Sequence, residues 1–184
     1  MGLSIEVKGH MKAFFLCAIA LIAAVSQAQT PTAKPEDVES ADSIIKAVYS
    51  VISGPAGEKR NWERMRSLFT DDARMMAIAK TQAGEVRKRP MTVEDYIKLN
   101  GPFLEERGFF EREIARRTET FGNLVHVWST YESRSKKEDE KPFARGINSM
   151  QLWNDGKRWY VLSIVWQGED PKTPLPEKYL KGGR

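Results

Sequence analysis

The sequence predicts a single α+β domain in which helices come first and long antiparallel strands follow. In the first half, apolar residues recur every three or four positions, which is the period of an amphipathic helix. From Phe109 onward the period changes to two, the period of strands that bury one face. The turn sequences Gly122-Asn123 and Asp155-Gly156 divide this second half into two hairpins. Helices kept apart from a meander of strands predict a sheet that curls around them.

Two helices are predicted first. Pro35 suits the first turn of a helix, and Gly54-Pro55 ends it. The apolar face of this helix consists of Ala41, Ile44, Ile45, Val48 and Ile52. Asn61 is the N-cap of the second helix, which ends at the turn-forming sequence Thr70-Asp71-Asp72.

A short pair of strands and a third helix follow. The strands are predicted over residues 75–79 and 84–90. The sequence Thr92-Val-Glu-Asp95 is similar to a capping box and opens the third helix, which ends at Gly108. Gly101-Pro102 is expected to break or kink this helix, because proline lacks the amide hydrogen that helices need.

The two hairpins make up the rest of the domain. Strands over 109–121 and 124–134 flank Gly122-Asn123, where glycine in first place predicts a type II′ turn. Strands over 145–154 and 157–167 flank Asp155-Gly156, which predicts a type I′ turn. The proline-containing segment from Asp170 has no periodicity and predicts an irregular tail.

The N-terminus predicts export. An apolar stretch over 13–25 follows basic residues and ends in Ser26-Gln27-Ala28, the pattern of a cleaved signal peptide over 1–28. The stretch is too short to span a bilayer, so no stable membrane anchor is expected, and the protein is expected to be periplasmic or secreted. Either Met1 or Met11 is the start. The chain's single cysteine, Cys17, lies inside this leader, so the mature chain has no disulfide and no thiol nucleophile.

The order of elements resembles the nuclear transport factor 2-like superfamily, which includes the SnoaL-like cyclases, ketosteroid isomerases and scytalone dehydratases. The resemblance is carried by Leu68-Phe69-Thr-Asp-Asp-Ala73 before a strand and by Asp155-Gly156-Lys-Arg-Trp159 in a hairpin. It implies a cone-shaped fold, with three N-terminal helices packed in a strongly curved antiparallel sheet. The predicted domain covers 36–168, after a disordered spacer at 29–35 and before the irregular tail at 169–184.

The same resemblance leaves the catalytic group unassigned. In the ketosteroid isomerases the general base comes four residues after the alanine of the similar Asp-Asp-Ala sequence, and that position here is Ala77. Tyr49 falls roughly where those isomerases carry an oxyanion-binding tyrosine. A hydroxyl donor without the base is not an active site, so the resemblance alone does not imply an enzyme.

His126 is the candidate base that remains, because it is the only histidine after the leader. The turn at Gly122-Asn123 places it opposite Glu119, and places Arg117 opposite Trp128 and Glu113 opposite Glu132. The alternative is a structural strand histidine. Either one of the opposed glutamates is protonated in a cavity, or both are solvated or paired with Arg117 and Arg134, and a compensating arginine is the simpler expectation. One histidine without cysteine supplies too few ligands for a metal site, and no cofactor motif occurs, so neither a metal nor a cofactor is expected.

The last hairpin supplies the other candidate residues. Its predicted turn places Arg145 opposite Trp166, as a cation–π pair or an anion-binding site, and Asn148 opposite Ser163. Arg145 and Asn148 are an odd number of residues apart, so they share a face only if a bulge, for example at Gly146, shifts the alternation. The predicted ligand-binding residues are Tyr49, His126, Trp128, Arg145, Asn148 and Trp166.

These observations favour an exported domain that binds a small, partly apolar ligand in the cone between helices and sheet. The alternatives are a lyase or isomerase of the SnoaL-like or dehydratase type and a dimerising interaction module. Both faces of the last hairpin are apolar, so one face is expected to form a homodimer interface or to line a cavity. The 29 basic and 25 acidic residues are interleaved rather than gathered on one face, which argues against a nucleic-acid partner.

Overall fold

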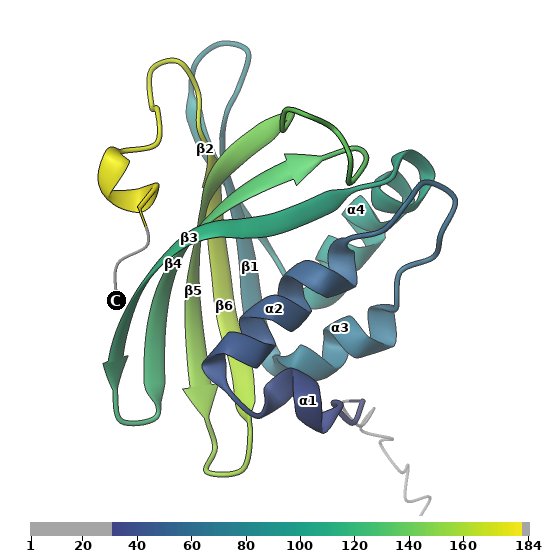
Figure 1. The fold of residues 1–184 in the computed structure, drawn as a ribbon, viewed down its shortest axis with the longest axis vertical. Coiled ribbons are helices and arrows are strands. Elements are labelled where there is room, and N and C mark those ends of the chain that lie inside the picture. The colour runs from purple at the N-terminus through teal and green to yellow at the C-terminus, as the bar shows by residue number, and fades with distance from the viewer. Residues whose placement is uncertain (1–30, 182–184) are drawn as a thin grey trace, which may run out of the picture.

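The structure is a computed structural model that describes residues 31–181, and it confirms the predicted α+β architecture (Figure 1). A six-stranded sheet bends around helices that cover its concave, inner face. The predicted signal peptide lies outside the described residues. The elements are α1 Pro35–Val38, α2 Ala41–Ile52, α3 Trp62–Leu68, β1 Phe69–Lys80, β2 Val86–Met91, α4 Val93–Arg107, β3 Phe110–Phe121, β4 Leu124–Arg134, β5 Ala144–Asn154, β6 Trp159–Gly168 and a 3-10 turn Glu177–Tyr179.

Side-chain caps fix where the helices begin. The predicted first helix is two helices, because the Ser40 hydroxyl accepts a hydrogen bond from the Ser43 amide at 3.0 Å and starts α2 anew. Asn61 caps α3 as predicted, through the amide of Arg64. The capping box that opens α4 is also confirmed.

Helix α4 runs through Gly101-Pro102, so the predicted break is absent. A Cβ at residue 101 would lie 3.2 Å from the Trp62 indole of α3, so glycine lets the indole pack closely against α4. Gly108 ends α4 with a φ of 74°, a conformation that favours glycine, and a Cβ there would lie 2.9 Å from the Ala56 amide nitrogen. A side chain therefore packs close to Gly101, and backbone atoms pack close to Gly108.

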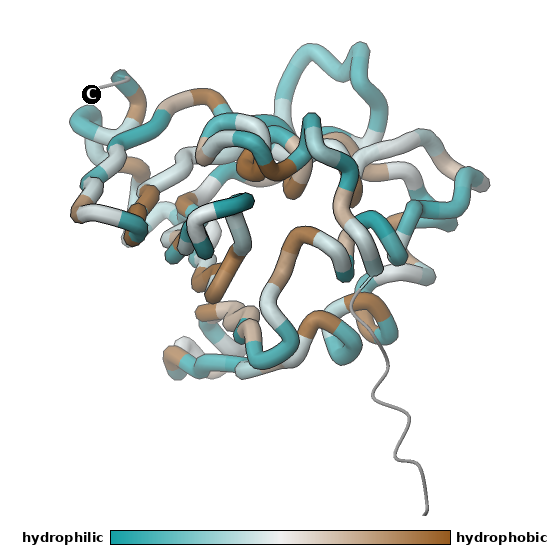
Figure 2. Tube along the Cα trace, turned by 90° about the horizontal axis from the view of Figure 1, so that it is seen from below, coloured by the Kyte–Doolittle hydropathy of each residue, from teal (hydrophilic) through white to brown (hydrophobic). Residues whose placement is uncertain are grey.

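The sheet has the strand order β2-β1-β6-β5-β4-β3. Neighbouring strands are antiparallel as predicted, except that β1 pairs with β6 in parallel. Strand β3 is an edge strand, and it crosses over the helices where the sheet bends most strongly (Figure 1). Figure 2 views the same layers from below, with hydrophobic segments in both the sheet and the helices.

A bulge in the first hairpin changes which side chains of β3 face the helices. Beyond it the predicted register is confirmed, with Glu119 opposite His126 and Gly122 at a φ of 57° as a type II′ turn requires. Ile114 is an extra residue that β4 does not match, so Glu113 lies opposite Tyr131 rather than opposite Glu132. Residues before the bulge are thereby turned to the other face.

The second hairpin also departs from its predicted register. Its loop has four residues, 155–158, because the Asp155 carboxylate accepts hydrogen bonds from the amides of Lys157 and Arg158, both at 2.8 Å. A bulge at Leu162 shifts the pairing once more. Asn148 consequently lies opposite Trp166, and the predicted pairing with Ser163 is wrong.

The core fills the space between the helices and the inner face of the sheet. The fully buried side chains that form its centre are Ile44, Ile45, Met65, Leu68, Phe69, Val127, Met150, Leu152 and Val161. The C-terminal segment was predicted to be irregular, but it forms a 3-10 turn and folds back over the outer face of the sheet. There Tyr179 stacks on Trp128 with 5.5 Å between ring centroids, and the Thr130 hydroxyl donates to the Tyr179 carbonyl at 2.6 Å.

Candidate functional site

Two cavities lie on the inner side of the sheet. The first, which we call the cone cavity, has a volume of about 250 Å³ and lies between α4 and strands β3 to β6. The second, the α2 groove, is an open groove of about 980 Å³ between α2 and the strongly bent part of β3 and β4. Of residues 31–181, Glu111 alone lines both of them.

The cone cavity is mostly apolar. Val48, Met65, Met75 and Ile164 form its inner walls, and the edge-to-face pair of Tyr96 and Trp166, with 6.1 Å between ring centroids, forms one side. Phe103, Phe109 and Phe143 also line the cavity. Phe103 and Phe143 are exposed to solvent. An apolar interior that opens past exposed aromatic rings is the usual construction of a site for a small organic molecule.

Glu111 contributes a carboxyl group to this cavity. Its carboxylate accepts a hydrogen bond from the Ser133 hydroxyl at 2.8 Å and another from the Asn148 side chain. Burial raises the pKa of Glu111 to about 7, and the two hydrogen bonds offset only part of that increase. Glu111 is half-buried because the two cavities reach it from either side, while protein surrounds it elsewhere. Its carboxyl can therefore exchange a proton near neutral pH.

Three tyrosines surround Glu111. Burial, together with the charge of Glu111, raises the pKa of Tyr49, Tyr96 and Tyr131 above the ordinary value. The hydroxyl of Tyr49 contacts Ser129 at 2.6 Å and accepts from Asn148 at 3.1 Å. Within residues 31–181, the hydroxyls of Tyr96 and Tyr131 have no hydrogen-bond partner, so both are available to a ligand in the cone cavity.

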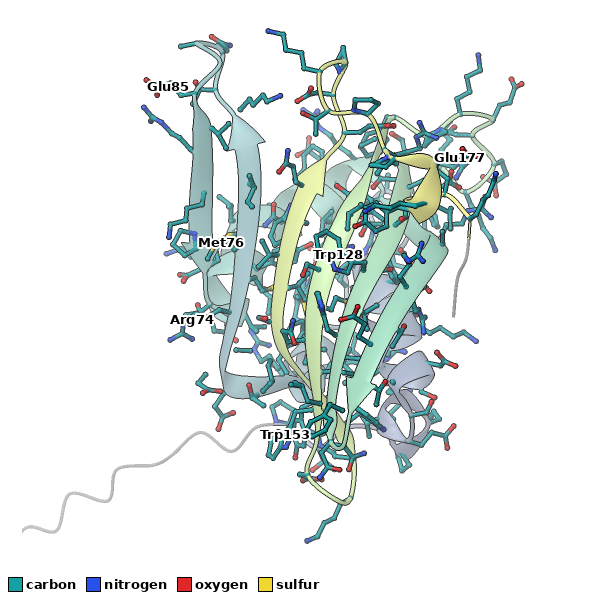
Figure 3. All side chains as sticks on the ribbon, turned by 90° about the vertical axis from the view of Figure 1, so that its left-hand side faces the viewer. Arg74, Met76, Glu85, Trp128, Trp153 and Glu177 are labelled. Carbon is teal, nitrogen blue, oxygen red and sulfur yellow. The ribbon has the colours of Figure 1, made fainter. Side chains whose placement is uncertain are left out.

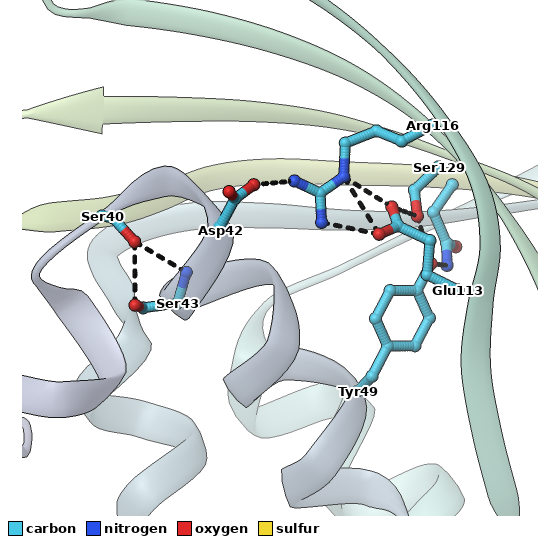
Figure 4. A network of polar contacts seen from close by, with 8 residues as sticks. Ser40, Asp42, Ser43, Tyr49, Glu113, Arg116 and Ser129 are labelled. Atoms are coloured by element: carbon cyan, nitrogen blue, oxygen red, sulfur yellow. Dashed lines mark hydrogen bonds and ion pairs between the residues drawn. The ribbon is translucent and has the colours of Figure 1, made fainter. Parts of the chain in front are cut away.

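The second inward-facing glutamate of β3 is compensated, unlike Glu111. Figure 4 shows Glu113 in a network that runs from Tyr49 through Ser129 to Arg116 and Asp42. Arg116 binds the Glu113 carboxylate with two nitrogens, at 2.8 and 2.6 Å. Glu113 is thus held as a paired anion, and Glu111 is left as the acid without a cationic partner.

The structure brings together three of the six predicted ligand-binding residues. Tyr49, Asn148 and Trp166 lie on the inner side, and Asn148 connects the other two through its hydrogen bond to Tyr49 and its pairing with Trp166. The bulge at Leu162, rather than one at Gly146, puts Trp166 on that side.

The other three lie elsewhere. His126 and Trp128 are on the outer face of the sheet, where the His126 ring contacts the Ser149 hydroxyl at 3.1 Å. Arg145 pairs with Glu169 at 2.5 Å, so the predicted pairing of Arg145 with Trp166 is wrong. None of these three side chains lines the cone cavity or the α2 groove.

No family model matches the sequence, and no curated protein matches it. Solved structures do match. A protein of unknown function with a cystatin-like fold from Nostoc punctiforme PCC 73102 has a TM-score of 0.51 at 13% identity, over 72% of this chain and 90% of that one. An NTF2-like protein of unknown function from Methylobacillus flagellatus KT has a TM-score of 0.46 at 16% identity, over 71% and 95%. LinA has a TM-score of 0.47 at 16% identity, over 72% and 88%.

The chain has an α+β fold similar to that of the Nostoc protein, whose fold is described as cystatin-like. The curved six-stranded sheet and the helices in its concave face agree with the fold that the sequence predicted. The position that the resemblance implied for a base, Ala77, does lie on the inner side of β1, opposite Trp166. In this chain, the carboxyl group that lines the cone cavity comes instead from Glu111 on β3.

Sequence reasoning missed Glu111 because of a single extra residue. Under the predicted pairing without a bulge, Glu111 falls opposite Arg134 on the outer face. The bulge at Ile114 moves it opposite Ser133 on the inner face. The same shift puts Arg112 opposite Glu132, and both Arg112 and Arg134 bind the Glu132 carboxylate. The prediction that an arginine compensates Glu132 is confirmed for Arg134, and Glu111 is the carboxyl left in a cavity.

Neither a metal-binding cluster nor a membrane-spanning helix is found among residues 31–181. Over residues 31–181, no group of three or more histidine, cysteine, aspartate or glutamate side chains is close enough to hold a metal ion. In the same range, no helix has both the length and the apolar character needed to cross a membrane.

Proposed function

We propose that this protein is exported and binds a small, partly apolar ligand in the cone cavity. The observation that carries the proposal is a carboxyl group, Glu111, on the wall of an otherwise apolar, aromatic-lined cavity that opens to solvent. A few polar groups in an apolar cleft orient a ligand while the walls supply most of the affinity. The hydroxyls of Tyr96 and Tyr131 add donors and acceptors beside Glu111.

The size of the cavity limits the ligand. At about 250 Å³ it is smaller than the pockets of about 300 to 1,000 Å³ that hold drug-sized molecules. A single six-membered ring with a short polar substituent suits this volume. The open end beside Phe103 and Phe143 leaves room for a longer substituent.

A thermal-shift screen tests binding, because a ligand that binds only the folded state raises the melting temperature. We would screen small aromatic and alicyclic alcohols, ketones, acids and amines. The variant Trp166→Leu removes one aromatic wall and is expected to reduce the shift of every compound found. Trp128→Leu is the matched control, since it makes the same change on the outer face and should leave the shifts intact. Equal effects of the two variants would contradict binding in the cone cavity.

Proton transfer is a second candidate function, of the lyase or isomerase type. It is favoured by the pKa of Glu111, which at about 7 suits a group that accepts and returns a proton at neutral pH. A hydroxyl from Tyr96 or Tyr131 is the electrophilic partner for charge that develops on a substrate oxygen. Deuterium exchange from solvent into the carbon-bound hydrogens of a bound ligand, followed by NMR, tests this role. Glu111→Gln should abolish the exchange and Glu119→Gln should retain it. Exchange that persists in Glu111→Gln would assign the base elsewhere.

Export and assembly complete the proposal. Cleavage between Ala28 and Gln29 is expected, and N-terminal sequencing of secreted protein checks it. A homodimer through the outer face of the sheet is expected, because large apolar side chains there remain exposed. These are Leu124 and the two tryptophans labelled in Figure 3, Trp128 and Trp153. Light scattering at micromolar concentration distinguishes a dimer from a monomer.

A further inference from the structure

Among the residues that the structure describes, no element packed against Glu111 presents a cation to it. The neighbours on α2 are Tyr49 and the hydroxyl of Ser53, which accepts from the Glu111 amide at 3.0 Å. The neighbours on α4, β4 and β5 are uncharged as well: Tyr96, Tyr131, Ser133 and Asn148. Burial is the leading influence on the pKa of Glu111, and no positive charge contributes to it.

The cations of the nearby α2 groove are bound to other carboxylates or exposed. Arg112 and Arg134 bind Glu132, and Arg116 binds Glu113 and Asp42. Lys46 and Lys137 lie at the solvent-exposed rim of the groove. Among residues 31–181, the half-buried carboxyl group of Glu111 therefore has no counter-ion, and a cation that pairs with it would be a ligand.

The walls around this carboxyl suit a positive charge. The aromatic rings of Tyr96, Tyr131 and Trp166 line the cavity beside Glu111, and the faces of such rings attract cations. The free hydroxyl oxygens of Tyr96 and Tyr131 can accept hydrogen bonds from an ammonium group. Carboxylate, aromatic faces and hydroxyl oxygens together supply what an alkylammonium ion needs once it leaves water.

We propose that the ligand of the cone cavity is an organic cation, a small primary amine with an apolar ring or chain, whose ammonium group pairs with Glu111. This inference rests on the proposed function, because it assumes that the cone cavity is the binding site. It assigns the ammonium group to the inner end of the cavity and the apolar body to the walls and the mouth.

Binding of such a cation depends on pH. The ammonium ion pairs with ionised Glu111, so binding at pH 6 drives the carboxyl to release its proton. With a pKa of about 7, roughly a tenth of Glu111 is ionised at pH 6 and roughly nine-tenths at pH 8. The affinity for an amine is therefore expected to rise about tenfold from pH 6 to pH 8. A neutral ligand of the same shape gains nothing over this range.

Calorimetric titration of the mature protein with benzylamine and with benzyl alcohol tests the inference. At pH 8 we expect the amine to bind at least tenfold more tightly than the alcohol. Glu111→Gln should bring the affinity for the amine down to that for the alcohol measured with the same variant. Glu119→Gln, an exposed glutamate of the same strand, should bind both compounds as the wild type does.

The alcohol separates failure of this inference from failure of the proposed function. If the alcohol binds and the amine binds no more tightly, the inference is overturned while a ligand site in the cone cavity stands. If the amine retains its advantage in Glu111→Gln, the inference is overturned as well. If neither compound binds and the wider screen finds no ligand, the proposed function fails with it. Circular dichroism of each variant confirms that a lost affinity is not lost folding.

Discussion

Glu111 predicts an unusual dependence of stability on pH. Its pKa is about 7 in the folded protein against an ordinary value of 4.5, so the folded state binds the proton more tightly than the unfolded state does. The stability associated with this group is fully present below pH 4.5 and is lost as the pH rises through 7. A difference of this size corresponds to about 3 kcal/mol of unfolding free energy between pH 4.5 and pH 8. The glutamine of Glu111→Gln does not ionise, so the free energy of unfolding of this variant should not show that decrease.

Urea denaturation of the wild type and of Glu111→Gln at pH 5 and pH 8 measures the effect. Other carboxyl groups titrate in both proteins, so the informative quantity is the pH-dependent difference between the two unfolding free energies. We expect Glu111→Gln to gain up to about 3 kcal/mol over the wild type on going from pH 5 to pH 8. Glu119→Gln should run parallel to the wild type. Parallel curves for the wild type and Glu111→Gln would refute the elevated pKa of Glu111.

Three further predictions concern other parts of the fold. Arg60 is buried and donates to main-chain carbonyls of α2, α4 and the loop between α2 and α3. Arg60→Ala should therefore lower the free energy of unfolding by roughly 3 to 5 kcal/mol in urea denaturation, and a decrease below about 1 kcal/mol would contradict this role. Asp37 binds Arg64 with both carboxylate oxygens at 2.8 Å, and Arg64 lowers the pKa of Asp37, so the bridge stabilises above the ordinary pKa of 3.8 and is lost as the pH falls. Asp37→Asn should therefore cost about 1 to 3 kcal/mol at pH 7, with a difference from the wild type that shrinks in acid. Tyr179→Ala should remove the stacking on Trp128, cost about 1 kcal/mol and shift tryptophan fluorescence to the red, whereas an unchanged emission spectrum would place the tail elsewhere.

Local signals in the sequence predicted most of the architecture. The N-cap Asn61, the capping box at Thr92, the C-cap Gly108 and the turn at Gly122-Asn123 all act where they were expected. Each of these signals works through contacts within a few residues, which is why a sequence read by itself reveals them. The parallel pairing of β1 with β6 depends on strands almost ninety residues apart, and no local pattern indicates it.

The candidate site was harder to predict, because side-chain direction along a strand depends on every pairing before it. Tyr49 and Asn148 lie on the inner side, and Trp166 reaches that side through a bulge that no sequence pattern indicates. The inward direction of Glu111 could not be predicted for the same reason, because Ile114 is an unmatched residue that shifts the pairing. Both errors have one cause, since one unmatched residue exchanges the two faces of a strand from that point on.

The bulge at Ile114 also matters for how relatives of this chain are compared. Strand β3 carries one residue more than its partner at this point, so the gain or loss of a single codon would exchange the inward and outward sets of side chains before it. Deleting Ile114 would send Glu111 and Glu113 to the solvent side and bring Arg112 inward, turning an acidic cavity into a basic one. An alignment that sets its gap two positions away would compare the acid of one protein with the surface arginine of another. Whether a relative has this extra residue in β3, more than its overall identity, decides whether the same side chains face the cavity.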